Sequence, residues 1–134
     1  MKLLNFAIIT LLVVLSTSCN KDNDSSPENP PVSLAGVYDG KYGFENEAPK
    51  AGYTLNFKSD GTIEEIGQSS GSAIGRGTFT LKGTHISAKY TMLSTPFHDY
   101  FIEAIYDPAK QTIDGTWGYE AGATDGGLFS VKKD

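Results

Sequence analysis

From Leu34 to the end of the chain, apolar and polar residues alternate, and turn-forming residues interrupt the alternation at intervals of about ten residues. A period of two places successive side chains on opposite faces of a β-strand, whereas an amphipathic helix needs a period near 3.6. The segment 53–58 shows the pattern most clearly, because Tyr53, Leu55 and Phe57 share one face. No stretch of this part of the chain offers a helical face, so we expect an all-β domain.

Turn signals divide this domain into about eight short strands, with Ser59–Gly61 and Gly83–Thr84 as the tightest connections. The expected strands are 36–44, 53–58, 62–68, 78–82, 86–92, 100–106, 112–119 and 128–132. Connections this short leave no room for crossover helices, so sequential strands should pair antiparallel in an up-and-down meander. Such a meander removes its exposed edges by closing into a small barrel. The glycine-rich stretches 67–77 and 122–127 are expected to be loops at a barrel mouth. The stretch 67–77 could leave a gap, so the sequence does not decide whether the barrel closes.

The N-terminal segment predicts export. Lys2 precedes an apolar run over residues 6–15, which as a helix of about 15 Å is too short to span a hydrocarbon core of about 30 Å. This is typical of a signal peptide. The run ends in Leu15-Ser-Thr-Ser-Cys19, which resembles the lipobox of bacterial lipoproteins. The resemblance implies a signal peptide over residues 1–18 and acyl chains on Cys19 that anchor the protein to a membrane.

Residues 19–33 are predicted to be a lipidated, disordered tether. They contain no aromatic residue, and Pro27, Pro30 and Pro31 favour an extended spacer. The segment 20–26, rich in Asn, Asp and Ser, resembles the export tag of surface lipoproteins of some Gram-negative bacteria, although a plain polar tether would look similar. We therefore expect a barrel domain over residues 34–134, anchored to the outer membrane of a Gram-negative bacterium; the sequence leaves open which face of that membrane carries it.

The amino-acid composition narrows the classes of partner that the protein is expected to bind. The single cysteine allows no internal disulfide, although exported proteins reach compartments where disulfides persist. The formal net charge of −5 becomes −6 on removal of residues 1–18, which contain Lys2 and no acid. This balance argues against nucleic acid and anionic lipid headgroups, which select basic patches. The expected partners are the membrane, through the lipid on Cys19, and a small ligand or a protein at the cell surface.

Three short motifs carry a family resemblance. Leu34-Ala-Gly-Val-Tyr38, Gly115-Thr-Trp-Gly-Tyr119 and Asp125-Gly-Gly-Leu-Phe129 resemble the bacterial lipocalin-like lipoproteins of the calycin group, which includes lipocalins and avidins. The resemblance implies a lipocalin- or avidin-like barrel that holds a ligand. Tyr38 stands where lipocalins carry the tryptophan of their Gly-x-Trp motif, and the biotin contacts of avidins have no position-by-position match. No biotin function is therefore implied.

Catalytic patterns are weak, so we expect no enzyme, no catalytic residue, no metal site and no cofactor. An all-β domain offers no strand-to-helix turn for a Gly-x-Ser-x-Gly nucleophile elbow, and lipid consumes the one thiol. His85 and His98 have acids nearby in the sequence, but adjacent side chains such as His98 and Asp99 diverge in a strand. The carboxylates considered as a catalytic pair are expected at mostly outward-facing strand positions; they are Asp39, Glu64, Glu65, Glu103 and Asp114.

The expected ligand site consists of aromatic residues and the single arginine: Tyr38, Tyr42, Arg76, Tyr90, Trp117 and Tyr119. Tyrosine joins an apolar ring to a hydroxyl, which suits a cavity for an amphiphile, although core packing explains the same residues. Arg76 could pair with a ligand carboxylate at the rim, or it could be exposed or stack on Trp117.

The leading hypothesis is a membrane-anchored protein that binds a small hydrophobic or amphiphilic ligand in its barrel. The alternative is a surface interaction or structural lipoprotein with a filled barrel, which contacts a protein partner through loops 69–74 and 94–99. An inhibitor or accessory subunit for another exported protein would have a similar sequence. The volume of the barrel interior discriminates between the first two hypotheses.

Overall fold

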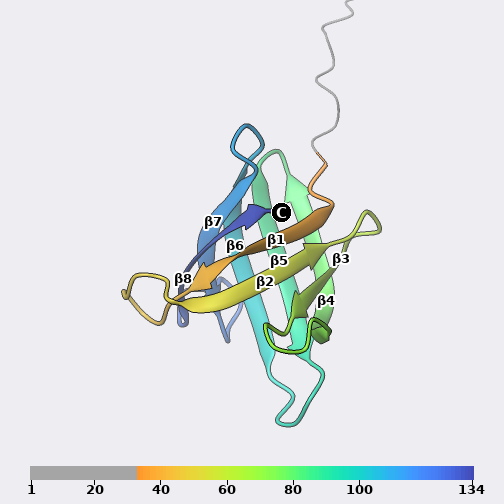
Figure 1. Ribbon diagram of the computed structural model, residues 1–134. Helices are drawn as coiled ribbons and strands as arrows, with labels where there is room; N and C mark the ends of the chain where they lie inside the picture. Colours follow the sequence, from red (N-terminus) through yellow and green to blue (C-terminus); the bar gives the residue numbers. More distant parts are fainter. Residues whose placement is uncertain (1–32) are drawn as a thin grey trace, which may run out of the picture.

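The computed structural model describes residues 33–134; the predicted signal peptide, Cys19 and the tether up to residue 32 lie outside the described residues. Eight antiparallel strands follow one another around a closed barrel (Figure 1). They are β1 (Gly36–Tyr42), β2 (Ala51–Phe57), β3 (Thr62–Ile66), β4 (Ala73–Lys82), β5 (His85–Met92), β6 (Asp99–Asp107), β7 (Thr112–Gly118) and β8 (Gly127–Lys133). The prediction of an all-β up-and-down barrel is confirmed. None of the residues described forms a helix long and apolar enough to cross a membrane.

Pairing of the first strand with the last closes the barrel. Tyr38 lies opposite Lys133 and Tyr42 opposite Phe129 in the β1–β8 ladder, while β1 also pairs with β2 along its whole length. Closure leaves no strand edge with unpaired backbone groups, which is why a meander of this size is stable without a covering layer.

The stretch 67–77, expected to be a loop throughout, is a loop only as far as residue 72. A register shift between Glu65 and Ile66 pairs Ile66 with Ala73, and β4 continues from there beside β5. Glycine at position 75 is required by space: a Cβ there would lie 2.7 Å from Cδ2 of Tyr90. Gly75 therefore allows β4 to approach β5 closely and does not form a turn. Phe44, which was expected at the end of the first strand, lies instead in the loop after β1.

The core fills one half of the barrel. Alternate residues of each strand point inward, and the largest fully buried side chains among them are Tyr38, Phe57, Leu55, Ile63, Ile86, Ile102, Ile113 and Val131. The Tyr38 ring meets Phe57 and Tyr106 edge to face, with ring centroids 5.6 and 6.1 Å apart. Edge-to-face contact is the favourable geometry for aromatic pairs, so this half is a packed plug.

The two ends of the barrel differ. Short turns at 58–61, 83–84 and 108–111 form what we call the closed end, where residue 33 enters and the chain terminates (Figure 1). Asp107 holds one of these turns by accepting hydrogen bonds from the amides of Ala109 and Lys110 at 3.0 and 3.1 Å. Longer loops at 43–50, 67–72, 93–98 and 119–126 form the open end.

Candidate functional site

Inside the open end lies a cavity of about 280 Å³. Its lining comes from inward-facing positions near the strand ends and from the adjoining loops, and consists of Tyr42, Phe44, Tyr53, Glu65, Ile74, Tyr90, Met92, Tyr100, Trp117 and Tyr119. Seven of these ten residues are aromatic and one is a carboxylic acid. The barrel is therefore neither hollow throughout nor filled throughout.

Trp117 is the centre of the aromatic wall. Its ring centroid lies 5.6 Å from that of Tyr42 and 5.5 Å from that of Tyr119, with interplanar angles of 88° and 76°. Its indole Nε1 donates a hydrogen bond of 2.9 Å to the carbonyl oxygen of Gly43, which fixes the ring orientation. Phe44 packs on the indole from the β1–β2 loop at 5.4 Å. Because neighbouring rings stand at steep angles, the walls present both ring faces and ring edges.

A second group of rings, on β2, β5 and β6, continues this wall. Tyr90 and Tyr100 stack with their centroids 5.4 Å apart and their planes at 14°. The Tyr53 and Tyr90 hydroxyls share a buried hydrogen bond of 3.0 Å. Burial raises the pKa of both tyrosines well above the ordinary value, so both hydroxyls stay neutral.

Among the described residues, Glu65 is the one acid that lines the cavity. Ile63 points into the barrel, and the period of two therefore turns Glu65 inward as well. Burial raises the pKa of its carboxyl above the ordinary value, and hydrogen bonding with Tyr90 opposes that rise. Among the described residues that line the cavity none is a lysine, arginine or histidine. Glu65 is thus an exception to the expectation that most of these strand carboxylates face outward.

Four of the six residues expected at the ligand site line the cavity: Tyr42, Tyr90, Trp117 and Tyr119. Tyr38 does not, because it lies in the plug, fully buried, and its hydroxyl has no hydrogen-bond partner within the described part of the chain. Tyr38 has the same inward parity as Tyr42, and parity alone does not tell which half of the barrel a residue occupies.

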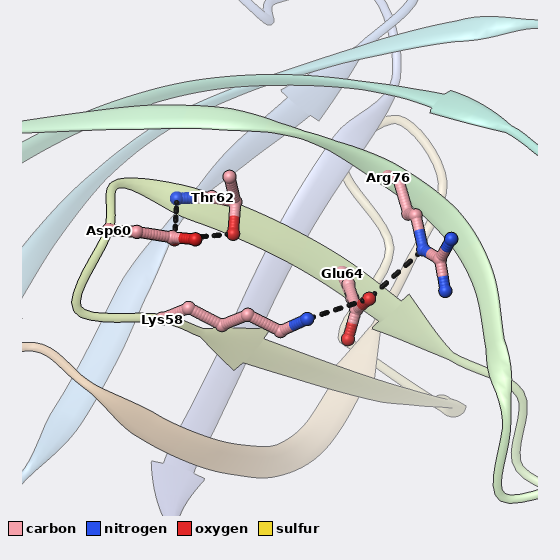
Figure 2. Close-up of polar contacts among 5 residues, drawn as sticks. All are labelled: Lys58, Asp60, Thr62, Glu64 and Arg76. Carbon is pink, nitrogen blue, oxygen red and sulfur yellow. Dashed lines mark hydrogen bonds and ion pairs between the residues drawn. The ribbon is translucent and has the colours of Figure 1, made fainter.

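Arg76 also lies away from the cavity. It is on the outer face of β4, where its Nε donates to Oε1 of Glu64 at 3.0 Å, and Lys58 approaches the same oxygen at 2.9 Å (Figure 2). Its contact is thus an ion pair on the barrel wall and not the stacking on Trp117 that the sequence left open. Asp60 accepts hydrogen bonds from the amide and hydroxyl of Thr62 beside this cluster (Figure 2).

The sequence did not indicate the remaining lining residues as a site: Phe44, Tyr53, Glu65, Ile74, Met92 and Tyr100. A signal for Glu65 exists, because two adjacent acids in a strand must point to opposite faces and one of them must therefore face the interior. Ile74 and Met92 gave no such signal, because apolar side chains like theirs are equally expected in a hydrophobic core.

The histidines lie apart from the cavity lining. Nε2 of His85 lies 3.2 Å from Oε2 of Glu103, whereas the His98 ring lies against Tyr119 with centroids 6.4 Å apart. Asp99 pairs instead with Lys89 at 2.6 Å. Within residues 33–134, no three side chains of the metal-ligating kinds gather closely enough to hold an ion.

No protein-family model, curated protein or solved structure matches the chain. The resemblance to lipocalin-like lipoproteins therefore stays a prediction. What distinguishes one function from another is the shape and chemistry of the cavity.

Proposed function

We propose that the chain is a membrane-anchored lipoprotein that binds one small amphiphilic ligand in the open end of its barrel. The observation that carries this proposal is the aromatic cavity of about 280 Å³. Ligand pockets commonly measure about 300–1,000 Å³ and combine apolar walls with a few convergent polar groups. This cavity lies near the lower limit, which favours a compact molecule over a long acyl chain.

The composition of the lining favours an amphiphilic ligand. Trp117, Tyr42 and Phe44 offer apolar surface, whereas Glu65 and the Tyr90 hydroxyl offer polar groups at one side of the same space. Buried polar groups that meet no partner are costly, so a ligand that combines a polar group with an apolar body gains most here. Binding without catalysis is favoured because Glu65 is the single acid among the described lining residues, while hydrolysis by paired carboxylates needs two.

The anchor and the cavity fit together in this proposal. Residue 33 enters the barrel at the closed end, and the open end lies at the opposite end (Figure 1). A lipid on Cys19 would hold the closed end toward the membrane through residues 19–33. The cavity would then open away from the lipid surface, toward ligands in the surrounding medium.

One observation favours the second candidate, a surface interaction protein. The β5–β6 loop exposes two large apolar side chains, Leu93 at 47% and Phe97 at 65%. Exposed apolar residues of this size are common at protein contacts. Two residues form a small patch, so the cavity remains the stronger argument.

Native mass spectrometry of the purified protein, incubated with extracts of lipids and small molecules, tests the two candidates. We expect a discrete adduct that vanishes on denaturation. Tyr119→Ala, which removes one ring from the cavity wall, should weaken that adduct by about tenfold, an amount typical of one aromatic contact. Phe97→Ala is the matched control and should leave it unchanged. If only the mass of the unbound protein is detected with every extract, the cavity proposal is refuted and a protein partner is favoured.

A further inference from the structure

We propose that the ligand of this cavity is an organic cation, whose ammonium group meets the Glu65 carboxylate between the aromatic walls. This inference rests on the proposed function and adds the chemical class of the ligand. Three independent features of the described residues carry it: an uncompensated carboxylate, a cage of aromatic rings and an acidic rim.

The first feature is the contrast between two adjacent acids. Glu64 faces outward and has two cationic partners, Lys58 and Arg76, at 2.9 and 3.0 Å (Figure 2). Glu65 faces the cavity, where its neighbours are tyrosines and the described lining residues include no cationic side chain. Glu65 is half-buried and burial raises its pKa, so its ionised form is costly unless it is paired. The missing counter-charge is what a cationic ligand would supply.

The second feature is the aromatic cage. The faces of aromatic rings are electron-rich, and a cation within about 6 Å of a ring centroid is attracted to them, most strongly by tryptophan. Trp117, Tyr42 and Tyr119 stand around the cavity at steep mutual angles, so a compact ammonium group could contact several rings at once. An anionic ligand would be repelled by the same faces and by Glu65.

The third feature is the charge of the rim. The two longest loops at the open end carry four exposed acids: Glu45, Glu47, Glu120 and Asp125. Lys50 is the only basic residue of these loops, and it is paired with Glu47 at 2.6 Å. Like-signed charges around a mouth raise the local concentration of oppositely charged ligands. The rim therefore favours the same class of ligand as the interior.

The titration of Glu65 agrees with this assignment. Its carboxyl faces the hydroxyls of Tyr53, Tyr90 and Tyr100, and burial raises the pKa of each of these tyrosines, so none becomes charged near neutral pH. Burial also raises the pKa of Glu65 itself. A bound cation would stabilise the ionised carboxylate and lower that pKa again. Affinity for a cation should therefore fall as the pH drops through the pKa of Glu65.

Pairs of matched probes test the inference on the purified protein. Choline and 3,3-dimethylbutan-1-ol have nearly the same shape but differ in charge, as do benzylamine and benzyl alcohol. Trp117, the single tryptophan of the chain, reports on the cavity by its fluorescence. We expect at least one cation to bind more tightly than its neutral counterpart by about tenfold or more. Glu65→Gln should abolish this preference, and Glu64→Gln should keep it, with circular dichroism showing that both variants are folded.

The outcomes separate the two proposals. Equal affinity for each cation and its neutral counterpart, or neutral binding alone, would overturn the cation assignment and leave the binding function in place. A preference that survives Glu65→Gln would overturn the role of Glu65. If neither these probes nor any extract component binds, the proposed function itself fails. The comparison of probes on the unmodified protein needs no variant, so it decides the charge preference even if Glu65→Gln does not fold.

Discussion

At the scale of single residues, Glu64 and Glu65 show how strongly position in a barrel governs the chemistry of a side chain. The two are adjacent and identical, yet hydrogen bonding with Lys58, together with the charges of Lys58 and Arg76, lowers the pKa of Glu64. Burial raises the pKa of Glu65. One carboxylate thus stabilises the outer wall, whereas the other is held at an energetic cost that function must justify.

This cost predicts a specific dependence of stability on pH. The folded state binds a proton at Glu65 more tightly than the unfolded chain does, so the contribution of Glu65 to unfolding free energy falls as pH rises from the ordinary glutamate pKa through the raised one. Glu65→Gln should remove this decline and stabilise the ligand-free protein at pH 7 by roughly 1 kcal/mol. Urea titrations of both proteins from pH 4 to pH 8 would measure the difference. Parallel curves for the two proteins would contradict it.

The site was partly predictable at this scale. Alternation placed Tyr42, Tyr90, Trp117 and Tyr119 on inward faces, and all four line the cavity. Alternation did not distinguish the two halves of the barrel, which is why Tyr38 was expected there too. For Arg76 the sequence did not indicate the actual partner, because the ion pair with Glu64 depends on the pairing of β3 with β4.

At the scale of elements, β4 differs most from expectation, beginning at residue 73 instead of 78. Its N-terminal half is rich in glycine, a composition typical of loops. In the barrel these glycines instead allow β4 to lie close to β5, a contact that becomes visible only once the two strands are paired. The other strands, which alternate cleanly and end at recognisable turns, lie within a few residues of their expected limits.

Substitution of Gly77 tests this explanation of β4. A Cβ at position 77 would collide with the carbonyl oxygen of Lys89 and with Cα of Tyr90, both backbone atoms of β5 that cannot move aside easily. Gly77→Ala should therefore cost several kcal/mol of unfolding free energy or prevent folding. The control is Gly71→Ala in the β3–β4 loop, where a Cβ meets nothing within 4 Å and only the positive φ of 64° is penalised, by about 1 kcal/mol. Equal losses, measured by denaturant unfolding, would argue against close approach.

At the scale of the whole molecule, the number of strands and their antiparallel order followed from the turn spacing. Closure was expected because it removes exposed strand edges, but the pairing of β1 with β8 that achieves it had no local signal, since the two strands are distant in the sequence. The asymmetry between a plugged closed end and a cavity at the open end is likewise a property of the assembled barrel. It results from where aromatic residues fall along the strands once all registers are set.

The predicted anchor is also a property of the whole molecule. Cys19→Ser removes the acceptor thiol, so the expressed protein should lose its acyl chains and move from the membrane fraction to the aqueous one. Detergent phase partitioning and intact-mass measurement would show both changes. Ser18→Ala, which keeps a small residue before the cysteine, should still be lipidated. An unchanged partition of Cys19→Ser would contradict the lipoprotein assignment.

The most direct test of ligand binding in the cavity is a heteronuclear NMR titration of the purified protein with choline. We expect the largest shift changes at the Trp117 indole Nε1–H, which donates to Gly43, and at the backbone amides of Glu65 and Tyr119. The closed end, including Lys58 and Asp107, should remain unchanged. Shift changes that saturate with choline but are confined to the loop around Phe97 and leave the indole unperturbed would contradict ligand binding in the cavity.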